Sequence, residues 1–205
     1  MIELYDCYSQ ESRDLHESLV ATGLSQLGVV IDADGFLPDG LVSPFTYYLG
    51  YEEGKPLYFN QVSVPAFWEI SGNNQSARIE DMTQERALIH YADGMQDRLV
   101  KQVDWKDLEG RVRQVDHYNR FGACFATTTY SADSEPMMTV YQDVNGQQVL
   151  LENHVTGDIL LTLPGQSMRY FANKVEFITF FLQDLEIDTS QLIFNTLATP
   201  FLVSF

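Results

Sequence analysis

The chain has 205 residues, of which 45% are hydrophobic and 13% aromatic, so it holds enough apolar material for a core and is not a disordered protein. Its formal net charge of −17 and sequence pI near 4.3 argue against a nucleic-acid partner and against electrostatic binding to anionic lipid, because both need clustered Lys and Arg. No apolar run reaches the ~18 residues that span a bilayer.

The amino-terminal residues lack the basic start and the apolar stretch of a secretory signal peptide. The two cysteines, Cys7 and Cys124, do not form the pattern of a disulfide framework. We therefore predict a cytoplasmic protein, with at most a peripheral association with the inner face of the cell membrane.

The chain opens with a short β-type run at residues 2–7, which is followed by a helical pattern. Ser9 is a suitable helix N-cap. Leu15 and Leu19 then fall at i, i+4 spacing, and Gly23 is a natural helix stop. A second β-type triplet follows at residues 29–31, so the opening is of the strand-then-helix kind.

The middle of the chain consists of short β-type runs separated by polar turns. In residues 103–163 these turns carry glycine at 110, 122, 146 and 157, and turns at about 8–12-residue intervals are typical of consecutive antiparallel strands. Further β-type runs precede them near residues 57–60, 67–70, 77–80, 87–91 and 98–105. We predict one antiparallel β-meander of eight or more strands, between about residue 57 and residue 171.

After the meander the pattern returns to helix and apolar strands. Val175 to Leu185 fit a helical period, and residues 192–194 and 201–205 are two short apolar runs. A return to α/β pattern after an excursion implies that the two chain ends share one sheet. The predicted fold class is therefore α/β with a large antiparallel β-meander insertion. Because the sequence stops inside an apolar run, we expect the front part of a longer protein.

Chemical motifs are scarce. There is no G-x-S-x-G elbow, phosphate-binding loop, G-x-G-x-x-G or zinc-type Cys/His spacing. His117 beside Asp116 resembles a catalytic pair, but neighbours on a strand point to opposite faces, so we expect a locally satisfied histidine. Trp68 and Trp105 are more typical of core or interface packing than of sugar stacking. We predict no catalytic residue, no metal site and no cofactor.

One predicted strand, within residues 123–130, offers a surface with few charges. Simple alternation places Cys124, Ala126, Thr128 and Tyr130 on one face. Another protein can dock on a low-charge patch without displacing many solvated charges. The edge strands of a long meander are a second candidate, because their backbone groups are unpaired.

Three separate motifs carry a resemblance to a known family. They are the opening residues 1–19, which begin Met-Ile-Glu-Leu-Tyr-Asp-Cys, the Asp-Gly-Phe-Leu-Pro run at 34–38 with Ser43 and Pro44, and Val-Asp-His-Tyr-Asn-Arg-Phe-Gly at 115–122. With these motifs, essentially the whole chain resembles the non-catalytic, stabilising subunits of the accessory Sec glycosylation system. Such a subunit pairs with a catalytic glycosyltransferase that attaches N-acetylglucosamine to serine-rich-repeat adhesins of Gram-positive bacteria before export.

The resemblance implies a GT-B-like fold of two Rossmann domains, with the extended β-sheet domain inserted in the first. Residues 1–42 would then be the first part of a Rossmann-like domain, residues 43–172 the inserted meander, and residues 173–205 the return to the Rossmann-like domain. The donor-sugar pocket of this fold lies mainly in the second Rossmann domain, which would be missing from the chain.

The resemblance has one departure that bears on mechanism. Catalytic relatives commonly have a glycine-containing loop after the first strand, whereas residues 7–12 read Cys-Tyr-Ser-Gln-Glu-Ser. This favours binding over chemistry. Acceptor contacts would fall at the carboxyl ends of the Rossmann strands, which points to Tyr8, Ser9, Gln10, Asn195 and Thr196. Their alternative roles are helix capping and loop polarity.

Three functions remain open at this stage. The leading hypothesis is an accessory subunit that binds the catalytic N-acetylglucosamine transferase through the meander and presents the Ser/Thr-rich acceptor polypeptide. The alternative is the acceptor-binding half of an active GT-B glycosyltransferase. A third is a free-standing β-rich sugar-binding module that needs no partner protein.

Overall fold

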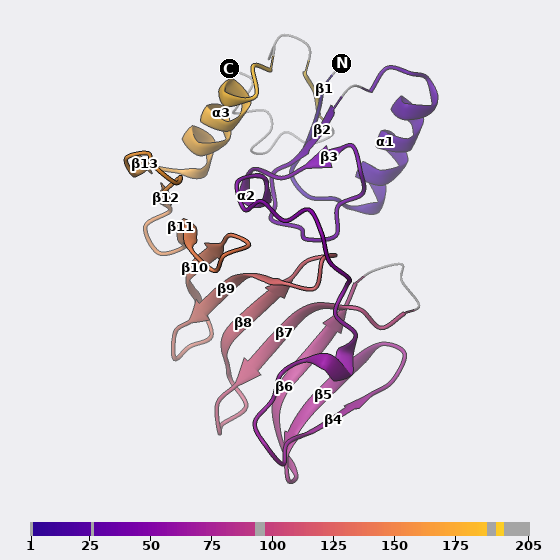
Figure 1. Ribbon diagram of the computed structural model, residues 1–205, viewed down its shortest axis with the longest axis vertical. Coiled ribbons are helices and arrows are strands. Elements are labelled where there is room, and N and C mark those ends of the chain that lie inside the picture. The colour runs from indigo at the N-terminus through magenta and orange to yellow at the C-terminus, as the bar shows by residue number, and fades with distance from the viewer. Residues whose placement is uncertain (1, 26, 93–96, 188–191, 195–205) are drawn as a thin grey trace. The chain divides into compact units, whose positions relative to one another are not determined.

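The structure, a computed structural model, describes residues 2–25, 27–92, 97–187 and 192–194 (Figure 1). Contacts divide the chain into two units, residues 1–48 with 157–205, and residues 49–156. The elements in chain order are β1 (Ile2–Tyr5), α1 (Gln10–Ala21), β2 (Leu27–Val30), β3 (Leu41–Val42), α2 (Pro44–Tyr47), a 3₁₀ helix (Phe59–Gln61), β4 (Glu69–Gly72), β5 (Ser76–Asp81), β6 (Gln84–Tyr91), β7 (Val100–Lys106), β8 (Val112–Tyr118), β9 (Cys124–Tyr130), β10 (Pro136–Gln142), β11 (Gln148–Asn153), β12 (Ile159–Leu161), β13 (Arg169–Phe171), α3 (Lys174–Asp184) and β14 (Leu192–Phe194).

The two ends of the chain share a small parallel sheet of order β14–β1–β2–β3. Ile2 pairs with Leu192 on one side and with Leu27 on the other, so the predicted common sheet is confirmed. Leu4 and Val29 are fully buried, as expected for parallel strands that are covered on both faces. The predicted apolar run at 201–205 lies outside the described residues.

Local sequence signals set the helix boundaries in this unit. Ser9 caps α1, its side chain accepting a hydrogen bond from the Ser12 backbone N–H at 3.3 Å. Beyond the C-cap, Gly23 has φ +69°, the left-handed conformation that ends many helices. Asn173 caps α3 in the same way through the Glu176 N–H. Both predicted helices are therefore confirmed.

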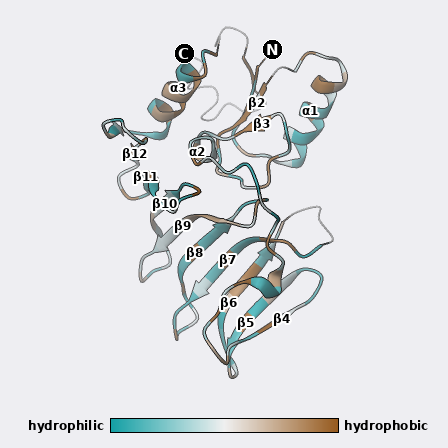
Figure 2. Cartoon of the chain, in the orientation of Figure 1, coloured by the Kyte–Doolittle hydropathy of each residue, from teal (hydrophilic) through white to brown (hydrophobic). Residues whose placement is uncertain are grey.

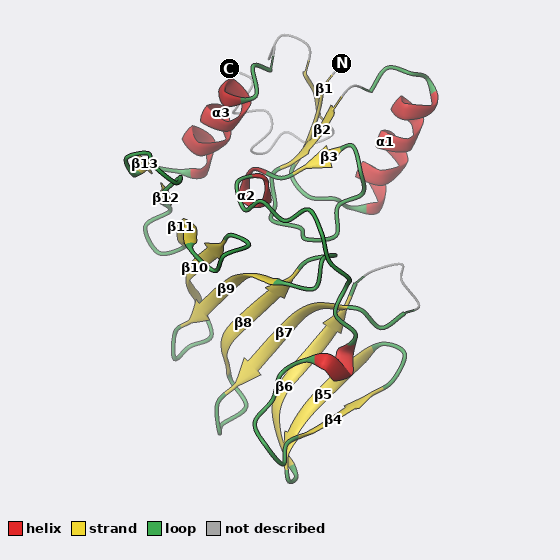
Figure 3. Cartoon of the chain, viewed as in Figure 1, coloured by secondary structure: helices red, strands yellow, loops and turns green. Residues whose placement is uncertain are grey.

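The large sheet has ten strands in the order β4 to β13, each hydrogen-bonded to its neighbour in sequence, and Figures 1 and 3 show β4 to β9 side by side. The prediction of a meander of eight or more strands is confirmed. The run at 57–60 is different, because it forms one bridge, Tyr58 to Leu99, and then the 3₁₀ helix. Phe59 packs against the apolar core of the sheet, so its aromatic side chain covers a face instead of extending the edge.

One face of β4 to β7 carries the core of the second unit. Its buried residues are Val62, Ala77, Ile79, Ala87, Ile89, Val100 and Val103, and Leu57, Phe59, Trp68 and Trp105 pack against them. Buried residues alternate with less buried ones along β5 and the middle of β6, and Figure 2 shows a hydrophobic stretch on β6, so every second residue there enters this core. Both tryptophans are thus partly buried and pack against this core, in line with the packing role that the sequence indicated.

The turn glycines have the conformation that the meander requires. Gly110, Gly122, Gly146 and Gly157 have φ values of +80°, +85°, +74° and +81°, where residues with a Cβ are disfavoured.

Among the described helices, none is long and apolar enough to cross a membrane.

Candidate functional site

Three of the residues predicted to contact an acceptor lie between β1 and the first turn of α1. Ser9 is used as the α1 cap, and Gln10 Nε2 donates to Asp14 Oδ1 at 2.7 Å. The Tyr8 ring lies 5.2 Å from the Arg13 guanidinium carbon, and desolvation raises the pKa of the Tyr8 hydroxyl. Asn195 and Thr196 lie outside the described residues. The loop therefore brings Tyr8, Ser9 and Gln10 together, with two of the three side chains engaged in local hydrogen bonds.

Ser12 also holds the loop between β1 and α1. Its side chain is buried, and its Oγ donates to the Cys7 carbonyl at 2.9 Å. A hydroxyl that bonds back to the backbone holds the turn between β1 and α1 in one conformation. In this chain, side-chain hydrogen bonds thus shape a loop in which catalytic relatives were expected to use glycine.

A buried polar cluster joins β1 to α1, and the sequence interpretation did not identify it. Glu3 is fully buried, and its Oε2 accepts a hydrogen bond from the Tyr5 hydroxyl at 2.8 Å. His16 Nδ1 lies 2.6 Å from the same oxygen. The sequence signal that could have identified this cluster is Glu3, a single carboxylate among the apolar residues of a short strand. Glu3 is fully buried and His16 is 8% exposed, so this hydrogen bond is a structural contact between β1 and α1.

The geometry predicted for the docking face on β9 is wrong in two respects. His117 pairs with Ala126, but the next residue, Tyr118, pairs with Cys124, so Phe125 forms a β-bulge. Since neighbours on β8 point to opposite faces, Cys124 lies on the face opposite Ala126. The contact of Cys124 Sγ with Thr127 Oγ1 at 3.9 Å agrees with this placement. The sequence alternation missed the inserted residue.

The other error concerns exposure. Ala126 and Thr128 are 2% and 5% exposed, and Tyr130 is half-buried. Thr128 Oγ1 is hydrogen-bonded to Thr139 Oγ1 at 2.8 Å and to His117 Nε2 at 3.0 Å. Burial also raises the pKa of the Cys124 thiol to about 11, so the thiol stays protonated near neutral pH. Replacing Thr128 by lysine would disrupt this buried hydrogen-bond network. A loss of partner binding in such a variant would therefore not identify an interface.

His117 and Asp116 do not form a catalytic pair. Asp116 accepts hydrogen bonds from Trp105 Nε1, Gln114 Nε2 and Thr127 Oγ1 at 2.7–3.1 Å on the opposite face from His117. His117 is instead satisfied by Thr128, as the strand alternation predicted.

His90 and His117 are expected to titrate on opposite sides of the ordinary histidine pKa of 6.5. The hydrogen bond from His90 to Asp104, 2.8 Å long, raises the pKa of His90, whereas burial lowers the pKa of His117. The stability from the His90 pair is present below the unfolded pKa and is lost as pH rises through the raised folded pKa. Neutral His117 has the opposite effect, because folding opposes its protonation and stability falls as pH drops.

NMR titration of the ring resonances between about pH 5 and 8 measures both values. In the Asp104→Asn control, the pKa of His90 should return toward 6.5 while that of His117 stays low. Two histidines that both titrate at the ordinary value would contradict the pairing and the burial.

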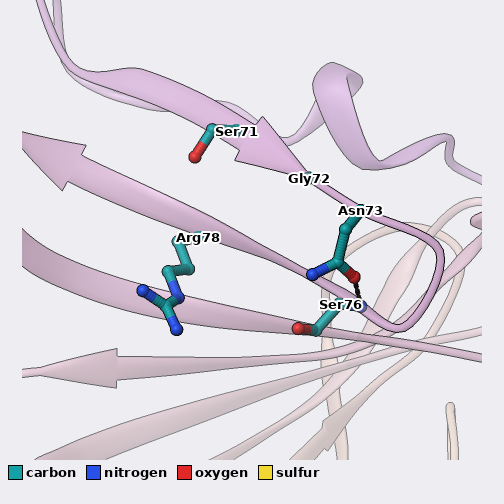
Figure 4. Close-up of a pocket in the computed structure, with 5 residues that line it drawn as sticks. All are labelled: Ser71, Gly72, Asn73, Ser76 and Arg78. Atoms are coloured by element: carbon teal, nitrogen blue, oxygen red, sulfur yellow. Dashed lines mark hydrogen bonds between the residues drawn. The ribbon is translucent and has the colours of Figure 1, made fainter.

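A polar pocket of about 370 Å³ lies beside β4 and β5 and is lined by Ser71, Gly72, Asn73, Ser76 and Arg78 (Figure 4). Asn73 Oδ1 accepts hydrogen bonds from the backbone N–H groups of Gln75 and Ser76 at 2.7 and 3.1 Å, so it shapes the hairpin turn. Arg78 Nε lies 3.3 Å from Glu85 Oε2. None of the five lining residues is a carboxylate, histidine or cysteine, so the pocket lacks the acid–base pair of an active site. The described residues also contain no group of three or more His, Cys, Asp or Glu able to hold a metal ion.

Three consecutive segments match the domains of one family. The GtfB N-terminal domain matches residues 2–48, the GtfB middle domain residues 68–172, and the GtfB third domain residues 174–205. The middle domain covers β4 to β13, which form the large sheet.

Two curated relatives share one protein name. A protein of Streptococcus pneumoniae serotype 4 is 93% identical over 205 residues, and a protein of Streptococcus gordonii is 53% identical over 206. Both are named UDP-N-acetylglucosamine–peptide N-acetylglucosaminyltransferase stabilizing protein GtfB. The matches cover 100% of this chain and 46% of each relative, so the chain spans about half the length of the curated relatives it matches.

Solved structures extend the likeness to three dimensions. A chain in the crystal structure of a GtfA/B complex bound to UDP and GlcNAc is similar with a TM-score of 0.94 and 53% identity, over 99% of this chain and 46% of that one. The pneumococcal O-GlcNAc transferase GtfA, solved with UDP and GlcNAc, shares the fold with a TM-score of 0.62 and 13% identity, over 94% of this chain and 43% of that one. With the middle-domain match alone covering about half of its residues, and with the flanking domains in the same order, the chain belongs to the GtfB family.

Proposed function

We propose that the protein carrying this chain is the non-catalytic, stabilising subunit of a protein O-GlcNAc transferase. It binds a catalytic glycosyltransferase and presents a Ser/Thr-rich acceptor polypeptide to it. The observation that carries the proposal is the TM-score of 0.94 to a chain of a GtfA/B complex, at 53% identity. The names of the relatives, which describe stabilising proteins, support it.

The chemistry of the described residues supports a binding role. The β1–α1 loop is held by the Ser9 cap and by Ser12, and it has no glycine that would let a donor phosphate approach the backbone. Glu3 and His16, the closest match to an acid–base pair in this unit, are buried. We assign acceptor contact to Tyr8, Ser9 and Gln10 at the carboxyl end of β1, where parallel sheets bind ligands.

The finer organisation belongs to the same proposal. The parallel sheet would be part of a GT-B-like Rossmann domain, formed by residues 1–42 and 173–205, and residues 43–172 would be its inserted meander. The fold likeness to GtfA supports this division. The complex would act in the cytoplasm, with any membrane contact peripheral, on serine-rich-repeat adhesins before export by the accessory Sec system.

The test uses the full-length protein and its catalytic glycosyltransferase, purified separately and mixed. We expect one complex by size-exclusion chromatography and an increase in the melting temperature of the catalytic subunit. At a ligand concentration of 100 times Kd, binding adds about 2.7 kcal/mol of stability, which corresponds to several degrees.

Release of UDP from UDP-GlcNAc, with a Ser/Thr-rich acceptor peptide present, is the second measurement. The protein alone should release none. If it releases UDP and a point substitution abolishes that release, the protein is itself a transferase. If the two proteins do not associate, the accessory role is wrong.

A further inference from the structure

Three large apolar side chains are exposed at one end of the meander. Phe67, Met82 and Leu108 are 97%, 91% and 67% exposed, and we name them the tip patch. Met82 lies in the β5–β6 turn and Leu108 in the β7–β8 turn, and Figure 1 shows both turns at the same end of the sheet. The three residues lie in three separate connections between strands, so the periodicity of the sequence did not predict that they form one surface.

The strand pairing brings the three residues to the same end of the sheet. Glu69 pairs with Glu80 across β4 and β5, so Phe67, two residues before β4, and Met82, directly after β5, lie at the same end of this strand pair. Gln84 Nε2 donates to the Leu108 carbonyl at 2.8 Å, which joins the Met82 turn to the Leu108 turn. The tip patch therefore consists of residues from neighbouring connections at one end of the sheet.

The backbone at two of these positions is unfavourable. Phe67 has φ +73° and Met82 has φ +57°, in a region where a residue with a Cβ costs of order 1 kcal/mol or more. Glycine or asparagine would be accommodated better at both positions. Since the two side chains are also almost fully exposed, the folded chain gains little burial in return, and such a combination is typical of a binding surface.

The charges beside the patch are also unfavourable in the isolated chain. Glu69 and Glu80 are directly opposite each other on β4 and β5, and like charges at such positions are destabilising. Of the nearby cations, Arg78 and Lys106 both pair with Glu85, and the Arg86 guanidinium lies over the Trp68 ring. Within the described part of the chain, neither Glu69 nor Glu80 forms an ion pair. A partner with basic side chains would relieve this repulsion.

We infer that the tip patch, with Glu69 and Glu80 beside it, is the docking surface for the catalytic glycosyltransferase. This inference rests on the proposed function and names the contact within it. A serine-rich polypeptide has few apolar side chains with which to cover Phe67 and Met82. A second copy would bring together two chains of net charge −17, which opposes self-association.

The sheet edge strengthens the choice of a folded protein as the occupant. β4 is the last strand in the order of the large sheet, so its outer backbone groups lie beside the patch and can pair with a strand of the partner. The GtfA fold, similar over 94% of this chain, has a corresponding sheet. The occupant is thus a protein surface with an apolar centre and basic side chains around it.

The experiment measures the Kd between the full-length protein and the catalytic glycosyltransferase, with a Phe67→Asn/Met82→Asn variant. The variant should melt at the parent temperature or above, because asparagine tolerates positive φ, while its Kd rises at least tenfold. The control is Val144→Asn, since Val144 is 62% exposed in the turn between β10 and β11, at the other end of the sheet. Its Kd should stay within twofold of the parent.

A charge variant, Glu80→Lys, separates the electrostatic contribution. It should raise the melting temperature of the isolated protein and raise the Kd for the catalytic subunit several-fold. An unchanged Kd for the Phe67→Asn/Met82→Asn variant overturns the tip patch while leaving the proposed function intact. A parent that does not bind the catalytic subunit overturns the proposed function itself. A parent that dimerises alone, with the dimer lost in the variant, assigns the patch to a second copy and overturns the inference.

Discussion

Replacing Gly122 by alanine is expected to lower the free energy of unfolding by about 3 kcal/mol, from two costs that add. Gly122 has φ +85°, and a Cβ built there would lie 2.2 Å from the Lys55 carbonyl oxygen. That atom belongs to backbone, so the segment before the 3₁₀ helix would have to move away from the β8–β9 turn. Urea unfolding followed by circular dichroism measures the loss.

Gly110→Ala is the matched control. Gly110 has φ +80°, but a Cβ there meets nothing within 4 Å. Only the conformational cost applies, of about 1 kcal/mol. Equal losses at the two positions would show that the close approach to Lys55 does not hold in solution.

The contact is reciprocal, which allows a sharper test. Gly54 has φ +144°, and its Cβ would lie 2.2 Å from the Phe121 carbonyl oxygen. Because Gly54→Ala and Gly122→Ala separate the same two backbone segments, the double variant should lose less than the sum of the single losses. Full additivity would mean that the two positions act independently.

Replacing His16 by leucine should be the other large loss, of about 3 kcal/mol. Glu3 is fully buried, and His16 is one of the two side chains bonded to its Oε2. Among the described residues, its other oxygen, Oε1, has no hydrogen-bond partner, so the loss of His16 leaves a buried carboxyl group bonded there to Tyr5 alone. An unsatisfied buried acceptor costs its full desolvation energy.

The double variant Glu3→Leu/His16→Leu identifies the source of that loss. Replacing both partners by apolar side chains removes the polar group that would otherwise be left unsatisfied. We expect the double variant to be more stable than His16→Leu by urea unfolding. If the double variant is equally or less stable, the loss arises from packing around His16 and not from the carboxyl group.

The sequence by itself determined the features that depend on neighbouring residues in the chain. Ser9 and Gly23 delimit α1 because capping is a matter of a few consecutive residues. Turn glycines such as Gly110 and Gly146 mark the ends of strands for the same reason. A meander pairs each strand with the next, so a list of turns also gives the order of the strands. Even the shared parallel sheet followed from the return of an α/β pattern.

Only the tertiary structure decided which of these residues are buried, paired or free. Alternation assigned Cys124 and Ala126 to one face, but the bulge at Phe125 shifts the register by one residue, and a shift of one exchanges the faces. Glu3 gained its partner from α1, 13 residues away, and the pairing of β4 with β5 brought Phe67 and Met82 to the same end of the sheet. These relations depend on where separate segments meet in space, and the local preferences of the chain do not contain that information.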